Sequence, residues 1–199
     1  NVGGGVRLNE TNLGDLVADG VLAICQEADP EVEIVMYPGY WVRASIEEGN
    51  ISKVETSSVF ANATCVYRKV FTAAELVEQM QDTVSKAGIE ENNLFMHTAG
   101  MKVTYVPGAE TNTLASITVG DTEVYKDGQI LVGDDWSVLC GYTLTADAAK
   151  DPQGAGWAIE DALIPDQATL IDKFDEWLAT GDAVFYDNIV APDSRVAAE

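Results

Sequence analysis

The sequence has 199 residues, 47% of them hydrophobic, and a mean hydropathy of +0.01, which excludes an intrinsically disordered chain and predicts a globular domain. Its formal net charge of −22, from 33 acidic and 11 basic residues, argues against partners such as nucleic acids and anionic membranes. No apolar run approaches the roughly 20 residues of a membrane-spanning helix, so we expect no membrane insertion.

The first predicted element is a helix over Glu10–Ile24, in which apolar residues recur at steps of three and four. Thr11 or Asn12 is the expected N-cap, and Asp15 adds negative charge at the positive end of the helix. Gly20 lies on the apolar stripe, which indicates that another group packs against the backbone there. The glycine-rich residues 1–6 are interpreted as a linker remnant, and residues 7–199 as a single domain.

The following elements mix strands and helices without regular alternation, which predicts an α+β fold with a mixed β-sheet and packed helices. Residues Thr72 and Glu75 form a capping-box signature for the second helix, and Asp166 is a suitable N-cap for the last one. A hairpin is expected across Gly120-Asp121. Strands are predicted at 33–37, 64–71, 101–106, 114–119, 123–125 and 136–140, short terminal strand pieces at 184–186 and 195–196, and a short helix at 157–164.

The cysteines and the single histidine point away from metal and nucleophilic chemistry in this chain. Cys25, Cys65 and Cys140 are widely spaced and form no CxxC pair, so buried thiols are favoured over a zinc site. His97 alone cannot supply the imidazoles of a two-metal hydrolase site, and no Gly-x-Ser-x-Gly elbow accompanies it. We therefore expect His97 to be a core or solvent-exposed residue, and predict no catalytic residue and no metal ligand here.

Five runs of the sequence form motifs that stand in a fixed order from Arg7 to about Cys140. The first begins at Arg7 and contains Glu-Thr-Asn-x-Gly, and the second ends in an Arg-x-x-Ile-x-x-Gly-x-Ile-Ser pattern that starts at Arg43. The third contains a Phe-x-Asn segment, and the five runs are 7–19, 37–52, 59–62, 70–76 and 99–105. In order and in register, these runs together resemble the C-terminal domain of the 5'-nucleotidase family of metallophosphoesterases, in which the third run resembles a Pro-Phe-Gly-Asn segment.

The resemblance implies a division of labour between two domains. In the family, an N-terminal domain with two divalent metal ions hydrolyses the substrate, and the C-terminal domain binds it. The latter stacks the base between two aromatic rings, holds polar groups with arginines and rotates to deliver the phosphate. Carried over by position, Arg7 and Arg43 match the arginines, Phe60 matches one stacking ring, and Asn62 matches the polar residue that contacts the base.

Several further expectations rest on this resemblance alone. The ligand would be a nucleotide or nucleoside, and the partner a metallophosphoesterase domain N-terminal to this chain. The metals would belong to that domain, so this chain alone is predicted to be inactive. The resemblance also implies an extracellular, cell-surface or periplasmic location and a role in nucleotide catabolism.

Two segments depart from the family pattern. The glycine turn before Arg43 is replaced by the bulkier residues 37–42. The loop that carries the second aromatic ring is replaced by residues 141–157, in which Tyr142 or Trp157 could serve as that ring and Asp147 or Asp151 could replace a lost carboxylate. These changes leave open an alternative function, a degenerate surface-interaction or spacer domain with the same fold. A hydrolase centred on His97 is a third hypothesis, for which we expect no turnover.

Overall fold

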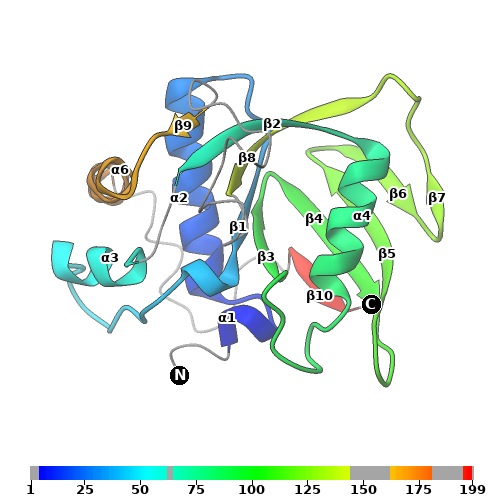
Figure 1. Cartoon of the computed structure of the whole chain (residues 1–199), viewed down its shortest axis with the longest axis horizontal. Coiled ribbons are helices and arrows are strands. Elements are labelled where there is room, and N and C mark those ends of the chain that lie inside the picture. The colour runs from blue at the N-terminus through cyan, green and yellow to red at the C-terminus, as the bar shows by residue number, and fades with distance from the viewer. Residues whose placement is uncertain (1–4, 62–64, 144–161, 181–194, 199) are drawn as a thin grey trace, which may run out of the picture.

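The computed structural model describes residues 5–61, 65–143, 162–180 and 195–198, and these segments form two five-stranded sheets with helices packed on them (Figure 1). The first sheet, sheet A, has the order β3-β1-β8-β2-β9. In sheet A, β1 runs parallel to β8 and antiparallel to β3, so the sheet is mixed as predicted. Its strands are β1 (Ile34–Pro38), β2 (Val66–Thr72), β3 (Met96–Ala99), β8 (Ser137–Thr143) and β9 (Ala162–Ile164).

The second sheet, sheet B, has the order β10-β4-β5-β6-β7. The chain enters it directly from sheet A at Gly100, between β3 and β4. Gly100 has φ +77°, and a Cβ atom there would lie 2.1 Å from the carbonyl oxygen of Glu33, so only glycine fits this crossing. The strands are β4 (Met101–Val106), β5 (Thr113–Val119), β6 (Thr122–Lys126), β7 (Gln129–Ile130) and β10 (Val196–Ala198).

The helices divide between the two faces of sheet A. Helix α2 packs on β1 and β3 and contacts α6, which in turn contacts α3 (Figure 1). Helix α4 contacts β2 of sheet A and β5 of sheet B, so it lies on the other side of sheet A. The helices are α1 (Gly5–Leu8), α2 (Asn12–Ala28), α3 (Lys53–Val59), α4 (Ala73–Val84) and α6 (Gln167–Ala179), with a 3-10 turn η1 (Gly39–Trp41). No helix in the described ranges is long and apolar enough to cross a membrane.

Helix α2 forms where the sequence pattern predicts it and buries the predicted stripe. Thr11 is the N-cap, and its Oγ1 accepts a hydrogen bond of 3.1 Å from the backbone N–H of Gly14. A Cβ atom on Gly20 would lie 2.3 Å from the ring of Phe174 and 2.8 Å from the ring of Trp177. The expectation that another group packs against the backbone at Gly20 is therefore confirmed, and that group is α6.

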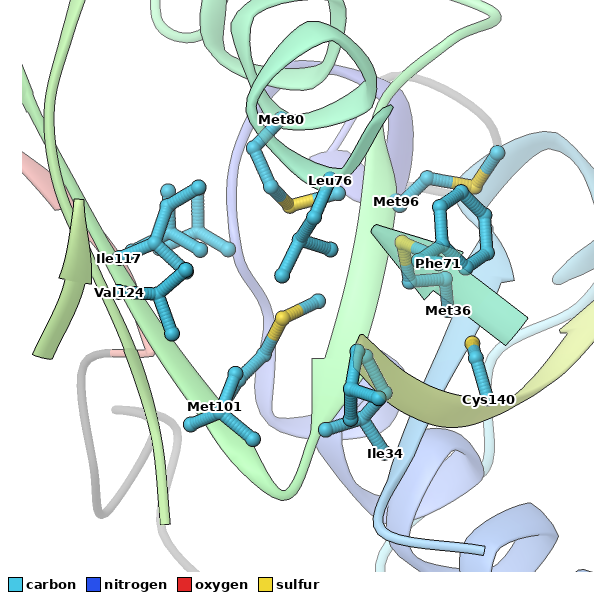
Figure 2. Close-up of a cluster of buried hydrophobic side chains, with 14 of the residues drawn as sticks. Ile34, Met36, Phe71, Leu76, Met80, Met96, Met101, Ile117, Val124 and Cys140 are labelled. Atoms are coloured by element: carbon cyan, nitrogen blue, oxygen red, sulfur yellow. The ribbon is translucent and has the colours of Figure 1, made fainter. Parts of the chain in front are cut away.

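Two hydrophobic cores result, one on each face of sheet A. The α2-side core includes Leu16, Val17, Val21, Ile24, Val35, Tyr37, Val59, Phe60, Leu139, Leu170 and Phe174. The inter-sheet core, shared by sheet A, sheet B and α4, includes Ile34, Met36, Phe71, Leu76, Met80, Met96, Met101, Ile117, Val124 and Cys140 (Figure 2). All four methionines of the chain lie in the inter-sheet core.

Most predicted elements are confirmed, including the capping box at Thr72 and the hairpin from β5 to β6. The short helix predicted at 157–164 is wrong in its last part. Residues 162–164 instead form strand β9, because this short apolar segment pairs with the edge of β2, where Ile164 lies opposite Val66. The terminal strand piece predicted at 195–196 is confirmed as β10, and residues 5 and 6 of the predicted linker belong to α1. The rest of 157–164 and the strand piece predicted at 184–186 lie outside the described residues.

Candidate functional site

Arg7 lies in the four-residue helix α1, which is fixed through the carbonyl group of Val6. This carbonyl is 3.0 Å from Nε2 of His97 and packs so closely on Gly39 that a Cβ atom there would lie 1.7 Å from the oxygen. The Arg7 guanidinium forms an ion pair with Glu91, whose side chain is half exposed. Arg7 is therefore placed beside the η1 turn by backbone packing, and its side chain reaches away toward the 89–95 loop.

Arg43 follows the same η1 turn on its other side. Its backbone N–H donates a 2.8 Å hydrogen bond to the carbonyl of Val59 at the end of α3. Its Nη1 atom donates to the carbonyl of Tyr40 at 3.1 Å, and the residue is exposed. The backbones next to both predicted arginines thus border η1, although the two guanidinium groups have different partners.

Phe60 caps the C-terminus of α3 and points into the α2-side core. Its ring is 0% exposed, with the Tyr37 ring centroid at 6.2 Å and the Phe174 ring centroid at 4.9 Å, both in edge-to-face geometry. Its carbonyl accepts a 2.7 Å hydrogen bond from Nε2 of Gln167. In this structure the ring offers no exposed face to a nucleobase, and the sequence pattern alone could not distinguish this core position from a stacking position.

Tyr142, the other described candidate for a stacking ring, lies in β8 on the opposite face of sheet A. Only 7% of it is exposed, and its hydroxyl donates to Oε1 of Gln79 at 3.0 Å. Its ring packs edge-to-face on Phe71, with centroids 5.5 Å apart, and burial raises the pKa of the phenol to about 12. Because sheet A separates Phe60 from Tyr142, the two rings do not face each other across one site. Asn62, Trp157, Asp147 and Asp151 lie outside the described residues.

The bulky residues that replace the family's glycine turn pack together within η1. The rings of Tyr40 and Trp41 have centroids 5.0 Å apart at an interplanar angle of 34°. Trp41 is 8% exposed and belongs to the α2-side core, and Tyr40 is half-buried against the same core. The space next to Arg43 is therefore occupied by aromatic side chains of the chain itself.

No family model matches the chain. Its structure is similar to that of a 5'-nucleotidase precursor from Thermus thermophilus, with a TM-score of 0.67 at 16% identity, covering 98% of this chain and 36% of that one. The fold is that of a 5'-nucleotidase C-terminal domain. The predicted α+β class and the resemblance to this family are thereby confirmed.

Two further comparisons show how far this likeness extends. This chain is 32% identical to the trifunctional nucleotide phosphoesterase protein YfkN of Bacillus subtilis over 102 residues, a match that covers 50% of this chain and 7% of YfkN. The NAD nucleotidase of Haemophilus influenzae matches with a TM-score of 0.54 at 16% identity, over 92% of this chain and 33% of that one. A sulfate thiohydrolase, SoxB of Thermus thermophilus, matches with a TM-score of 0.54 at 13% identity, over 99% of this chain and 35% of that one. The chain thus spans a small part of these proteins, and its fold occurs with more than one substrate.

His97 is a buried residue of this domain. It is 1% exposed, and burial lowers the pKa of its imidazole to about 4. One ring nitrogen is next to the Val6 carbonyl, and the other lies under Gly14, where a Cβ atom would be 2.0 Å away. A neutral imidazole enclosed in this way has no access to a substrate, so the geometry gives a His97-centred hydrolase no support.

The described residues contain no group of three His, Cys, Asp or Glu side chains that could hold a metal ion.

The sequence pattern did not predict a cluster of charged side chains that lies near the N-terminus of α2. Glu10, Asp15, Asp19 and Arg195 lie together there, although 176 residues separate Asp19 from Arg195. Asp15 and Asp19 are four residues apart, which places them on one face of the helix, and this spacing is the only local feature of the sequence that points to the charged cluster. Nothing in the sequence indicated that Arg195 would join them.

Proposed function

We propose that this chain is the substrate-recognition domain of a nucleotidase-like phosphohydrolase, in which Arg43 binds the anionic group of a nucleotide. The proposal rests on the exposed position of Arg43 just after the η1 turn. The names of the similar proteins, a nucleotide phosphoesterase, a 5'-nucleotidase and an NAD nucleotidase, support a nucleotide as the ligand class.

Because the chain is strongly acidic, its few arginines are the groups best suited to bind an anionic ligand. Arg7, Arg43, Arg68 and Arg195 are the only arginines in a chain of net charge −22. An anion that approaches this surface meets repulsion, so a phosphate must find a guanidinium group with matching geometry. Arg195 is held by Asp19, Arg68 by Asp29 and Glu31, and Arg7 by Glu91. Arg43 is exposed and lies just after η1, which favours it as the main anion ligand.

The geometry favours phosphate recognition over stacking of the base. Phe60 and Tyr142 are buried on opposite faces of sheet A, so base stacking between them would require both cores to open. We therefore propose that the phosphate supplies most of the binding energy. Hydrolysis would belong to a metal-bearing N-terminal domain, and the protein would act outside the cytoplasm, at the cell surface or in the periplasm.

The proposal is tested by titrating the purified chain with AMP and with adenosine at 0.15 M salt, following binding by calorimetry. AMP should bind in the millimolar range or tighter and adenosine at least tenfold more weakly. Arg43→Ala should weaken AMP binding by about tenfold, the effect of one charge-assisted hydrogen bond of about 1.5 kcal/mol. Arg68→Ala is the matched control, because it removes an exposed arginine that is paired with acids on a different element. Phe60→Ala is unsuitable, since it would disrupt the core.

A second candidate function is a non-catalytic interaction or spacer domain with the same fold. It is favoured by the burial of both candidate rings and by the aromatic pair that fills η1. If neither AMP nor adenosine binds the folded chain at 10 mM ligand, the proposal of nucleotide recognition is rejected and the interaction or spacer function is supported. Equal binding of both ligands would instead favour base recognition over the arginine model.

A further inference from the structure

The strand β10 is fixed to the N-terminus of α2 by a set of charged contacts. Arg195 donates from Nη1 and Nη2 to the two carboxylate oxygens of Asp19, at 2.5 Å and 2.8 Å. The backbone N–H groups of Arg195 and Val196 donate to the two oxygens of Glu10, at 2.6 Å and 3.1 Å. We call Glu10, Asp15, Asp19 and Arg195 the β10 latch.

The latch joins the two layers of the fold. β10 lies at the edge of sheet B and runs parallel to β4, with the N–H of Val103 donating to the carbonyl of Arg195 at 2.5 Å. Glu10 directly precedes α2, which covers sheet A. The Nη1 atom of Arg195 also donates to the carbonyl of Thr98 in β3, at 3.1 Å. A strand of three residues has little pairing of its own, so these contacts add to the attachment of β10.

Asp15 is the unusual member of the latch. It is 1% exposed, and neither of its carboxyl oxygens receives a hydrogen bond from any donor in the described part of the chain. Its carboxyl group lies next to that of Glu10. Two ionised carboxylates can only accept, so a hydrogen bond forms between them only when one holds a proton. Burial, and then the charge of Glu10, raise the pKa of Asp15 to about 8.

We propose that the β10 latch is a proton-dependent device, closed while Asp15 and Glu10 share a proton and weakened when that proton is lost. The two oxygens of Glu10 accept from the backbone N–H groups of Arg195 and Val196, and a protonated Asp15 can donate to one of them. Loss of the proton adds a third negative charge in a buried site, where it repels Glu10 and Asp19. This inference is independent of nucleotide recognition.

The direction of the pH effect follows from linkage. The pKa of Asp15 in the closed latch lies above its ordinary value of 3.8, so the closed state binds more protons than the open state between pH 4 and pH 8. The stabilisation is complete below about pH 4, is lost as the pH rises and changes no further above about pH 8. Glu10, whose pKa is also raised by burial, acts in the same direction.

Two other titratable groups that face the latch, His97 and Tyr105, keep their charge in most of this window. His97 in β3 lies near Arg195, and burial lowers the pKa of its imidazole to about 4, so it is neutral above that pH. Tyr105 in β4 faces Glu10, and burial raises the pKa of its phenol, so it is neutral as well. Asp19 is held in its bidentate pair with Arg195. Between pH 5.5 and 7.5 the response therefore belongs to the Asp15–Glu10 pair.

The test is amide hydrogen exchange of Arg195 and Val196 at pH 5.5 and pH 7.5, measured by NMR and corrected for intrinsic exchange rates. One linked proton changes the opening equilibrium by at most about tenfold per pH unit, and so by at most about a hundredfold across these two units. Within this limit, we expect the protection factors of the two amides to fall at least tenfold. The amide of Met80 in α4 is the internal reference and should change less than threefold.

Asp15→Asn keeps the shape of the side chain, cannot ionise and can donate to Glu10. In this variant the protection of Val196 should change less than twofold over the same pH range. Asp172→Asn, which removes an exposed acid paired with Lys53, should behave as the wild type. If Asp15→Asn does not fold, Asp15→Leu serves the same purpose. The proposal is overturned by an equal fall in the Asp15 variant and the wild type, by no fall in the wild type, or by an equal fall at Val196 and Met80.

Discussion

The two faces of sheet A are built in different ways. On the α2 side, backbones approach closely: Gly14 packs on the His97 ring and Gly20 on the Phe174 ring. Polar groups are buried there as well, among them His97 and the hydroxyl of Tyr37. The inter-sheet core instead contains every methionine of the chain together with aliphatic residues (Figure 2). One face depends on close fit and the other on adaptable side chains, and Phe60 belongs to the close-fitting face.

The largest effect should come from Phe60→Ala, which removes a ring enclosed by Tyr37 and Phe174. A fully buried phenylalanine replaced by alanine costs about 3–5 kcal/mol, because the lost contacts leave a cavity. Urea unfolding monitored by circular dichroism measures this loss, and Phe60→Leu should cost clearly less. If the Phe60→Ala protein kept wild-type stability but no longer bound AMP, the Phe60 ring would contact the ligand. This result would contradict its assignment to the α2-side core.

His97→Gln tests the buried polar groups of the same face through their pH dependence. Burial lowers the pKa of His97 to about 4 from an ordinary 6.5, so the folded state binds fewer protons than the unfolded state between these values. The wild type should lose about 3 kcal/mol of stability from this group as the pH falls from 7 to 4.

The measurement compares urea midpoints of wild type and His97→Gln at several pH values. The difference between the two proteins isolates His97, because the capping carboxylates and the opposite contribution of Asp15 are common to both. Glutamine keeps an N–H that can reach the Val6 carbonyl, so the variant should fold. Parallel pH profiles would show that His97 is not held neutral.

Local signals in the sequence predicted those elements that depend on neighbouring residues. Thr72 and Glu75 are three positions apart, and their reciprocal bonds form within one turn of helix. The direction of the Phe60 side chain depends on Phe174, which lies 114 residues further along the chain, and no local pattern encodes that contact. The same holds for Arg195, whose partner Asp19 is 176 residues away. The family motifs predicted the fold. They did not predict the burial of the rings, because it depends on contacts between residues far apart in the chain, Phe60 with Phe174 and Tyr142 with Phe71.

Gly20→Ala should break the close fit of the α2 face directly. A Cβ atom at this position would lie 2.3 Å from the Phe174 ring, which is itself 1% exposed and cannot move aside. Alanine gains about 1 kcal/mol of helix propensity over glycine, but the overpacking should outweigh this gain and leave a net destabilisation of about 1–3 kcal/mol.

Gly5→Ala is the matched control for this prediction. Gly5 also lies in a helix, and the nearest atom to its Cβ position, on Thr11, is at an ordinary contact distance of 3.6 Å. Thermal unfolding of both variants separates the contribution of helix propensity from that of packing. If Gly20→Ala were as stable as the wild type, α6 would have to move away from α2, and the close fit of this face would be disproved.

Met80→Leu tests the adaptable face and should have the smallest effect. Met80 is fully buried in α4 and projects into the inter-sheet core (Figure 2). The substitution conserves volume, leucine is a good helix former, and the neighbouring Met36, Met96 and Met101 can change rotamer to fill small gaps. We therefore expect a loss below about 1.5 kcal/mol in urea unfolding. A loss as large as that of Phe60→Ala would mean that the inter-sheet core is as tightly fitted as the α2 side, since only a core without room to repack makes such a conservative change costly.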